Sequence, residues 1–170
     1  MLFLGSFPPP AGRWSIPFYY PNWINDFWRI MGLIHYGDKD RFCIAAEKRF
    51  DEKAIRAFCE EAGLAFYDTV CEVRRLRDNA SDAYLEVVEQ TDLKELLKQI
   101  PYCAAVISTG QKSAEIVTEQ FGCGMPSIGA YIEVLIEGGR VIRFWRMPST
   151  SRAYPLPLQK KAEFYRRLFE

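Results

Sequence analysis

The stretch MLFLGSFPPPAGRWSIPFYYPNWINDFW, residues 1–28, decides how this chain begins to fold. The apolar run from Met1 to Leu4 predicts a buried first strand that delivers a Gly-Ser-Phe-Pro turn to the end of a sheet. Prolines at positions 8, 9, 10, 17 and 21 fix φ and remove amide donors, so the aromatic side chains between them are held at a low entropy cost. This composition favours a pocket for a flat ligand.

Beyond this stretch, helical periodicity alternates with short apolar runs. Further strands are expected at 64–70 and 103–108, and the Glu-Gly-Gly-Arg sequence predicts a hairpin between 131–136 and 141–146. The predicted helices are 22–34 with Asn22 as its cap, 51–62 with Gly63 as its stop, a helix from the cap Thr91 to Pro101, a helix from Gly110 through Gln120, and 160–169.

Strands that alternate with helices predict an α/β fold, a three-layer sandwich with a mostly parallel central sheet covered on both faces. We expect one domain that spans residues 1–170. In such folds, sites gather beyond the carboxyl ends of the strands. Four polar or turn-forming blocks follow predicted strands and are expected to converge on one cleft: Gly5–Pro8, Asp68–Arg77, Thr109–Lys112 and Met147–Arg152.

The net charge constrains the partner. The 22 basic and 22 acidic residues cancel, whereas an unspecific duplex binder usually carries an excess of Lys and Arg. If DNA is the partner, the charge must be uneven in space; otherwise each basic cluster is only a solvated face. The basic clusters are Arg74, Arg75 and Arg77 in one predicted loop, and Arg143, Arg146 and Arg152 around a late Pro-Ser motif.

Cysteine and histidine usage bears on compartment and metal binding. Five scattered cysteines favour a reducing compartment, so we expect a cytoplasmic protein, and Met1 to Leu4 is too short for a secretion signal. No run of about 18 apolar residues predicts a membrane span. With His35 as the chain's only histidine and no Cys-x-x-Cys, neither a metal site nor another cofactor is expected. We expect a monomer.

Several motifs, taken in order, carry a family resemblance. They are Leu4-Gly5-Ser6-Phe7-Pro8, Tyr19-Tyr20-Pro21, Asn25-Asp26-Phe27-Trp28, Phe66-Tyr67-Asp68-Thr69-Val70, Thr109-Gly110-Gln111-Lys112-Ser113-Ala114 and Met147-Pro148-Ser149-Thr150-Ser151-Arg152-Ala153. In this order they resemble the uracil-DNA glycosylase superfamily, most closely its hypoxanthine-DNA (deoxyinosine) glycosylase branch. The resemblance spans nearly the whole chain.

The resemblance implies a DNA glycosylase of base-excision repair that hydrolyses the bond between deoxyribose and a deaminated base, hypoxanthine or uracil. The base must first leave the stack, and the enzyme then needs a stacking wall, hydrogen-bond donors and a held water. No Lys in the motifs suggests an imine-forming nucleophile, so we expect a monofunctional enzyme without a lyase step. Two alternatives stay open: a non-catalytic nucleic-acid or nucleotide binding module, and a hydrolase of free nucleosides or nucleotides.

Base contacts are expected from the early motifs. Phe18 and Tyr20 are the candidates for the stacking wall, since base–aromatic stacking contributes about 1 to 3 kcal/mol; the alternative is that both rings belong to the core. Gly5, Ser6 and Phe7 form the first turn, in which the backbone amides of Ser6 and Phe7 would donate to the base.

Asn25 is the predicted catalytic residue because the resemblance assigns the water to this position, and an amide oxygen can orient a water. Its alternative role is a hydrogen bond near a helix start. Asp26 would be the stronger base if it turned inward, although neighbours on a helix point about 100° apart. Phe7 and Met147 stand where many superfamily members carry polar side chains, and neither can polarise a water.

DNA contacts are expected from two later motifs. The resemblance brings the loop of Pro148, Ser149, Thr150, Ser151 and Arg152 to the minor groove, with Arg152 placed for a phosphate or groove contact. Lys112, just after Gly110 at a helix start, would bind a phosphate, although such a position can hold any anion. The alternative for the loop is a turn shaped by its hydroxyl groups.

Overall fold

The structure is a computed structural model that describes residues 1–75 and 85–170. The chain forms two compact units that interleave along the sequence. Unit 1 comprises Met1–Pro8 and Ala65–Met147, and unit 2 comprises Pro9–Leu64 and Pro148–Glu170. Of the predicted basic loop, Arg77 lies outside the described residues. Within the described residues, no helix is long and apolar enough to cross a membrane.

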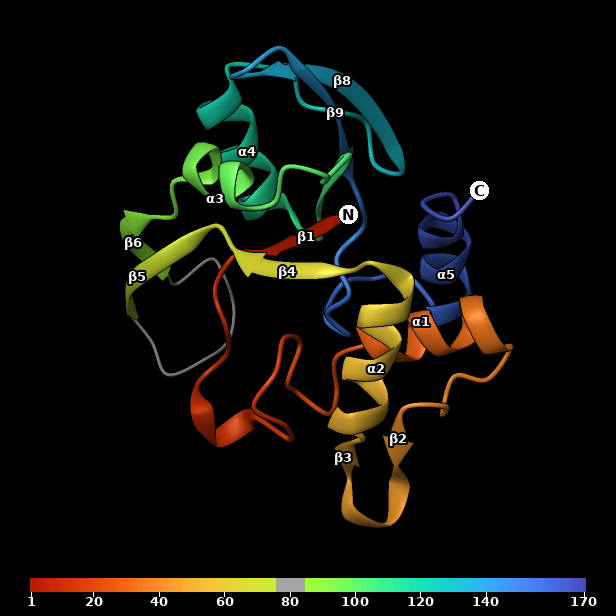
Figure 1. Ribbon diagram of the computed structural model, residues 1–170. Coiled ribbons are helices and arrows are strands. Elements are labelled where there is room, and N and C mark those ends of the chain that lie inside the picture. Colours follow the sequence, from red (N-terminus) through yellow and green to blue (C-terminus); the bar gives the residue numbers. More distant parts are fainter. Residues whose placement is uncertain (76–84) are drawn as a thin grey trace. The chain divides into compact units, whose positions relative to one another are not determined.

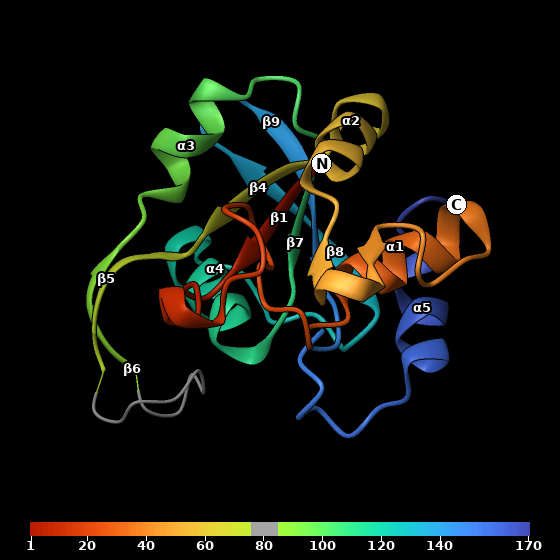
Figure 2. The same ribbon diagram turned by 90° about the horizontal axis from the view of Figure 1, so that it is seen from below.

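Unit 1 is built on a five-stranded sheet (Figures 1 and 2). Its strands, in spatial order, are β4 (Ala65–Asp68), β1 (Leu2–Gly5), β7 (Ala105–Ser108), β9 (Arg140–Arg146) and β8 (Ala130–Ile136). The first four strands are parallel, and β8 joins β9 in the antiparallel hairpin that the sequence predicts. The α/β class and the mostly parallel sheet are therefore confirmed.

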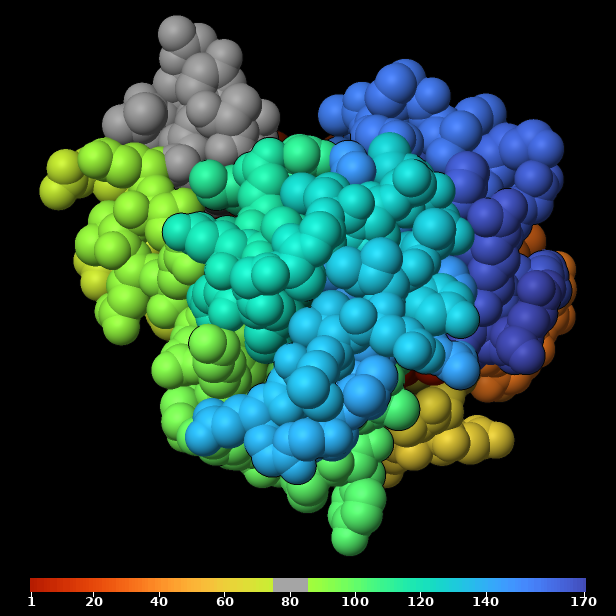
Figure 3. Space-filling model, turned by 90° about the horizontal axis from the view of Figure 1, so that it is seen from above, coloured from red at the N-terminus to blue at the C-terminus, as the bar shows by residue number. Residues whose placement is uncertain are grey.

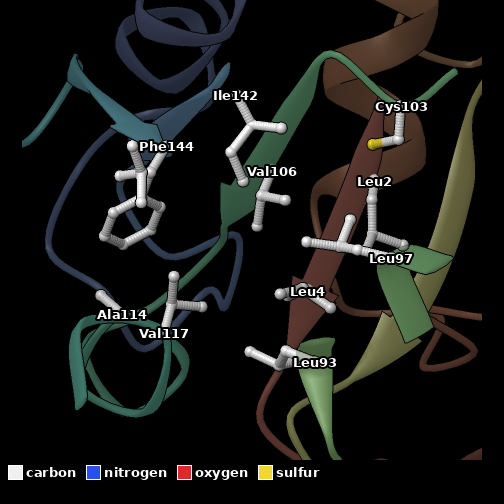
Figure 4. Packing of buried hydrophobic residues seen from close by; sticks show 11 residues of the cluster. Leu2, Leu4, Leu93, Leu97, Cys103, Val106, Ala114, Val117, Ile142 and Phe144 are labelled. Carbon is white, nitrogen blue, oxygen red and sulfur yellow. The ribbon is translucent and has the colours of Figure 1, made fainter. Parts of the chain in front are cut away.

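Side-chain alternation along β1 explains how the sheet is packed. Leu2 and Leu4 point to one face, where they meet apolar residues of α3 (Leu93–Gln99) and α4 (Gln111–Phe121), as Figure 4 shows. Phe3 points to the opposite face, stacks on Phe66 of β4 at 5.5 Å between ring centroids, and is also fully buried. Residues on both faces of the sheet are therefore buried, as the sequence predicts.

Unit 1 also contains a hairpin that the sequence analysis missed. Strands β5 (Val70–Arg75) and β6 (Leu85–Gln90) pair antiparallel. Arg74 and Arg75 therefore lie on a strand rather than in the predicted loop, and Arg74 forms an exposed ion pair with Glu86 at 3.6 Å. The segment is rich in charged residues and its pairing is shifted by a bulge, so it lacks a clear apolar alternation.

Unit 2 contains three α-helices and short irregular elements. The helices are α1 (Phe27–Tyr36), α2 (Glu52–Ala62) and α5 (Leu158–Arg166), and α1 and α5 lie side by side (Figure 1). The remaining elements are η1 (Ala11–Arg13), β2 (Cys43–Ile44), η2 (Ala45–Glu47) and β3 (Arg49–Phe50). An aromatic core surrounds α1, in which Phe27, Trp28, Phe42 and Tyr165 are almost completely buried.

Helix boundaries follow local capping, with some corrections. Asp51 accepts a hydrogen bond from the amide of Ala54 and Gly63 ends α2 with φ 64°, so this helix lies where the sequence predicts it. The predicted cap Asn22 is wrong, because α1 begins only at Phe27. Thr91 is also not a cap: Asp92 caps α3, accepting from two backbone amides.

The start of α5 shows how proline shifts a boundary. Pro157 precedes its first residue and gives the chain the fixed φ of a helix start, so the helix begins at Leu158 rather than at Lys160. The last turn ends at Arg166, before the predicted Phe169. These differences of a few residues do not change which face of the helix is buried, since Ala162 and Tyr165 are buried as expected.

Candidate functional site

The carboxyl ends of the parallel strands share one edge of the unit 1 sheet, here called the carboxyl edge, formed by Gly5, Asp68, Ser108 and Arg146. Threonines join the strand ends there. Thr69 donates to the carbonyl oxygen of Gly5 from both its amide (2.9 Å) and its hydroxyl (3.1 Å). Thr109 likewise donates to the carbonyl oxygen of Leu4 from its amide (3.2 Å) and its hydroxyl (3.3 Å). These hydrogen bonds fix the Gly-Ser-Phe-Pro turn that follows β1 against the ends of the neighbouring strands β4 and β7.

Gly5 and Asp68 approach each other closely at this edge. A Cβ built at position 5 would lie 2.4 Å from the Asp68 carboxylate oxygen, so a side chain there would force the end of the Asp68 side chain to move. The Asp68 carbonyl accepts from the Thr91 hydroxyl at 2.7 Å, and Val70 donates its amide to Ser6. The sequence analysis placed Asp68 in a block expected at the cleft but assigned no role to its side chain.

Lys112 lies in the first turn of α4, which begins directly after the carboxyl edge. Gly110 precedes this helix and provides no side-chain cap, while the Ser113 hydroxyl donates to the Gly110 carbonyl at 3.1 Å. Arg146 donates to the Gln111 side chain at 2.5 Å. A first turn that carries backbone amides and a lysine suits an anion, and the anion-binding role of Lys112 stays a prediction.

Asn25 closes the turn that leads into α1. Its amide donates to the Asn22 carbonyl at 2.8 Å, and its side-chain Oδ1 accepts from the amide of Phe27 at 2.8 Å. The carboxamide therefore has the structural role near a helix start that the sequence left open. An amide oxygen has two lone pairs and its NH₂ group two donors, so this contact leaves capacity for a water.

Arg29 supports the Asn25 turn from within α1. Its guanidinium donates to the carbonyls of Trp23 (2.8 Å) and Asn25 (3.1 Å) and lies 4.3 Å from the centroid of the Trp23 ring. Arg29 is only 6% exposed, and burial lowers the pKa of its guanidinium. Its contacts to two carbonyls and an aromatic ring hold the turn in one geometry. No periodicity in the sequence distinguishes this arginine from a surface residue.

Asp26 is the centre of a buried ion cluster. Its carboxylate accepts from the Lys161 ammonium at 2.9 Å and from Nε of Arg152 at 3.2 Å, and these three side chains are here called the Asp26 cluster. Asp26 and Lys161 are 6% and 1% exposed. Both carboxylate oxygens are bound by cations, which favours a structural role for Asp26 over the alternative role of a base.

The loop from Pro148 to Arg152 is fixed by α1 and α5. Tyr165 donates its hydroxyl to the Pro148 carbonyl at 2.9 Å, Lys161 donates to the Ser151 carbonyl at 2.7 Å, and the Asp26 amide donates to the Thr150 carbonyl at 3.0 Å. Burial raises the pKa of the Tyr165 hydroxyl well above 10, so this donor keeps its proton.

The loop's hydroxyl groups also shape it. Ser149 and Ser151 accept from the amides of Ser151 and Ala153, each at 3.2 Å. Thr150 is buried, whereas Ser151 and Arg152 are exposed. The turn-shaping role that the sequence left open is therefore present, and it is combined with an exposed, basic tip.

The predicted stacking wall is packed against α1. Tyr20 has a positive φ of 51° and its ring lies parallel to Phe27, at 4.0 Å and 5°. Phe18 stacks on Trp28 at 6.0 Å and lies beneath the guanidinium of Arg56, at 4.4 Å. Both rings are partly exposed. A left-handed residue other than glycine is strained, and such strain is common at ligand sites.

The structure divides the predicted site residues between the two units. Gly5, Ser6, Phe7 and Lys112 belong to unit 1, where their strands place them at or just beyond the carboxyl edge. Unit 2 contains Phe18, Tyr20, Asn25 and the loop from Pro148 to Arg152. Within unit 2, the backbone hydrogen bond from residue 26 to Thr150 brings the Asn25 turn next to that loop.

A shallow groove of about 290 Å³ lies elsewhere on unit 1, beside the turn between β8 and β9. Arg140 lines it and donates to the carbonyls of Leu97, Ile100 and Pro101, which end α3. In Figure 3, this turn (light blue) lies against the segment around residue 100 (green). Because Arg140 is committed to these carbonyls, we assign the groove a structural role.

Cysteine and metal-ligand side chains are dispersed. Among the described residues, no three His, Cys, Asp or Glu side chains group closely enough to hold a metal ion. All five cysteines are free thiols, and burial raises the pKa of the Cys59 thiol to about 12, so this thiol is unreactive. The cytoplasmic location stays a prediction.

Comparison with known proteins identifies the fold. No protein-family model and no curated protein matches the chain. A solved structure, the solution NMR structure of a putative uracil DNA glycosylase from Methanosarcina acetivorans, is similar with a TM-score of 0.62 and 20% sequence identity. The match covers 99% of this chain and 90% of that one. At this identity the likeness shows the fold: the chain has a uracil-DNA-glycosylase-like α/β fold.

Proposed function

We propose that the protein is a monofunctional DNA glycosylase that hydrolyses the N-glycosidic bond of a deaminated base, hypoxanthine or uracil, without a cofactor. The order of its motifs and the similarity of its fold to a structure described as a putative uracil DNA glycosylase support this proposal. The closer relation to the hypoxanthine branch belongs to the proposal and rests on the motifs alone.

One observation carries the proposal. The Asp26 amide donates to the Thr150 carbonyl, which fastens the turn that presents Asn25 to the Pro-Ser loop, although the two segments are distant in sequence. A glycosylase needs this pairing, because the group that orients the water and the group that holds the DNA backbone must act on the same nucleotide.

The roles follow from the chemistry. Bond cleavage develops positive charge on the sugar and negative charge on the departing base. In the proposal, Asn25 orients the water, the amides of Ser6 and Phe7 donate to the base, and Asp68 accepts from a ring N–H. Hypoxanthine and uracil both carry such an N–H beside a carbonyl group, so one acceptor next to amide donors matches either base. Phe18 and Tyr20 would contact its flat face.

The test uses duplexes that contain one inosine or one uracil, followed by alkaline cleavage. We expect the wild type to produce an alkali-sensitive site and Asn25→Ala to do so at least about 100-fold more slowly, a loss typical of a group that positions a reactant. Cleavage by Asn25→Ala at the wild-type rate would show that the catalytic assignment is wrong.

The chain offers a matched control for this substitution. Asn22 belongs to the same turn, and its Oδ1 also accepts from the amide two residues on, that of Ile24, at 3.1 Å. Asn22→Ala and Asn25→Ala therefore remove the same kind of structural hydrogen bond. We expect Asn22→Ala to keep most of the activity, so that a loss confined to Asn25→Ala reflects the water and not the turn.

A second candidate function is a non-catalytic DNA-binding module. It is favoured by the hydrogen bond that Asn25 already makes to Phe27 and by the packing of Phe18 between Trp28 and Arg56. A wild type that binds abasic DNA but leaves inosine and uracil intact would identify such a module. Cleavage of free deoxyinosine, with duplex DNA left intact, would instead indicate a nucleoside hydrolase.

A further inference from the structure

The Asp26 cluster joins one carboxylate to two cations of different exposure. Lys161 is buried, and its ammonium group donates to Asp26 and to the Ser151 carbonyl. Arg152 reaches the same carboxylate from outside, with 49% of its side chain exposed. The cluster thus connects the helix start after Asn25, the exposed tip of the Pro-Ser loop, and α5.

Stability alone is a weak explanation for this arrangement. Removing two charges from water is costly, and a buried ion pair often stabilises a protein no more than well-packed apolar residues of similar volume would. A function in positioning is therefore the better explanation to test. The hydrogen bonds that join the Ser151–Arg152 tip to α1 and α5 involve the Asp26 carboxylate or its partner Lys161.

The geometry leaves part of Arg152 available to a ligand. Only Nε of its guanidinium is engaged by Asp26, and the Nη groups have no hydrogen-bond partner within residues 1–75 and 85–170. A guanidinium held at Nε keeps its plane fixed, and its remaining donors form a fork that matches two oxygens of a phosphate. The carbonyls of Pro148, Thr150 and Ser151 accept from α1 and α5, so these three do not compete for the Nη donors.

We propose that Asp26 is a positioning residue that, with Lys161, orients Arg152 to bind a backbone phosphate of the nucleic acid; this inference rests on the proposed function. Asp26 does not touch the phosphate. It fixes the guanidinium plane and the loop before the nucleic acid arrives, which removes the ordering cost of a long, flexible side chain.

The test is a double-mutant cycle on binding to a duplex with one abasic site. Arg152→Ala is compared with its parent in two backgrounds: the wild type, and Asp26→Leu/Lys161→Met, which replaces the buried pair by apolar residues of similar size. In the wild-type background, we expect Arg152→Ala to raise Kd about tenfold, as for a charge-assisted hydrogen bond, and to lower the slope of log K against log salt by roughly one.

In the background without the pair, Arg152 is still present but no longer held. We therefore expect Arg152→Ala to raise Kd by about twofold or less there. A merely structural role for Asp26 would lower the melting temperature and leave the tenfold effect of Arg152→Ala unchanged in both backgrounds, and this result would overturn the inference. Thermal unfolding of each variant shows that the compared proteins are folded.

Lys160 provides the control for charge. It neighbours Lys161 on α5, is exposed, and pairs with Glu163 at 2.9 Å. We expect Lys160→Met to change Kd less than twofold; a loss as large as that of Arg152→Ala would show that general positive charge, not an oriented arginine, attracts the DNA. If the wild type cleaves inosine or uracil DNA but shows no coupling, only this inference fails. If it neither binds nor cleaves any duplex, the proposed function and the inference fail together.

Discussion

The carboxyl edge of unit 1 and the Asp26 cluster of unit 2 fix their loops in different ways. At the carboxyl edge, neutral hydrogen bonds from Thr69 and Thr109 tie strand ends together, and the end of the Asp68 side chain lies close to Gly5. In unit 2, charged side chains tie a loop to two helices. Neutral contacts between neighbouring strands tolerate a single loss, whereas a buried charge that loses its partner stays uncompensated. The comparison therefore predicts that single substitutions at the carboxyl edge lower the free energy of unfolding moderately. Loss of one partner in the Asp26 cluster should lower it much more.

The largest effect is expected from Lys161→Ala. It leaves Asp26 buried with only the half-exposed Arg152 as its partner, and the free energy of unfolding should fall by about 3 to 5 kcal/mol, as measured by chemical denaturation. Asp26→Leu/Lys161→Met should restore most of this loss because no uncompensated charge is left. A loss below about 1 kcal/mol would show that the cluster does not behave as a buried ion pair.

Gly5→Ala tests the close approach at the carboxyl edge. The added methyl group would lie 2.4 Å from the Asp68 carboxylate oxygen and would force that side chain to turn, so the free energy of unfolding should fall by about 0.5 to 1.5 kcal/mol, the cost of a side chain displaced from its rotamer. Gly12→Ala is the control, because a Cβ there meets nothing within 4 Å. Equal stability of the two variants would contradict the packing seen at this edge.

Thr109→Val examines the neutral hydrogen bonds. It removes the donor to the Leu4 carbonyl and keeps the side-chain shape, so the loss should be about 1 kcal/mol in a urea titration. Thr69→Val should cost a similar amount, and the two losses should add if each hydrogen bond acts by itself. A loss of several kcal/mol for either variant would remove the contrast with the Asp26 cluster.

The smallest effect concerns His35, which lies against the ring edges of Phe58 and Phe169 at 4.8 and 4.5 Å. Burial, with a smaller contribution from Arg166, lowers the pKa of His35 below 6.5. The unfolded chain therefore binds the proton at higher pH than the folded one. The contribution of neutral His35 to the free energy of unfolding is therefore fully present above pH 6.5, and it is lost as the pH falls below this value.

His35→Gln should flatten this pH dependence. Because His35 is exposed, the difference between pH 7 and pH 5 should stay below about 1 kcal/mol. Melting temperatures of wild type and variant across this range measure it. An identical pH profile for both proteins would show that the histidine does not couple to folding.

Local signals explain how much of the fold the sequence predicts. Helix α2 is bounded by Asp51 and Gly63, which act through hydrogen bonds to residues nearby, so its ends can be predicted from a few letters. The buried strands β1 and β7 are also predicted from local sequence, because each is a short run of apolar residues. The β5–β6 hairpin lacks such a signal because it is charged and shifted by a bulge.

The candidate site was predictable only in part. Strand ends placed the motifs of unit 1, but the contact from Arg152 to Asp26 joins residues 126 positions apart and leaves no local pattern. Lys161 resembles any surface lysine of an amphipathic helix, and only tertiary packing distinguishes it from Lys160. The hydrogen bond of the Asn25 side chain to the backbone could be predicted from the sequence, since asparagine near a helix start commonly bonds to the backbone.

The adjacency of a buried and an exposed lysine gives this protein an internal reporter. An amine-reactive label should modify Lys160 rapidly, whereas the Lys161 ammonium, 1% exposed, should react only when α5 detaches locally. Because both groups sit on the same helix and are read from the same peptide, their labelling ratio measures the opening of that helix without any substitution. The same ratio, followed during addition of DNA, would show whether a ligand slows that opening.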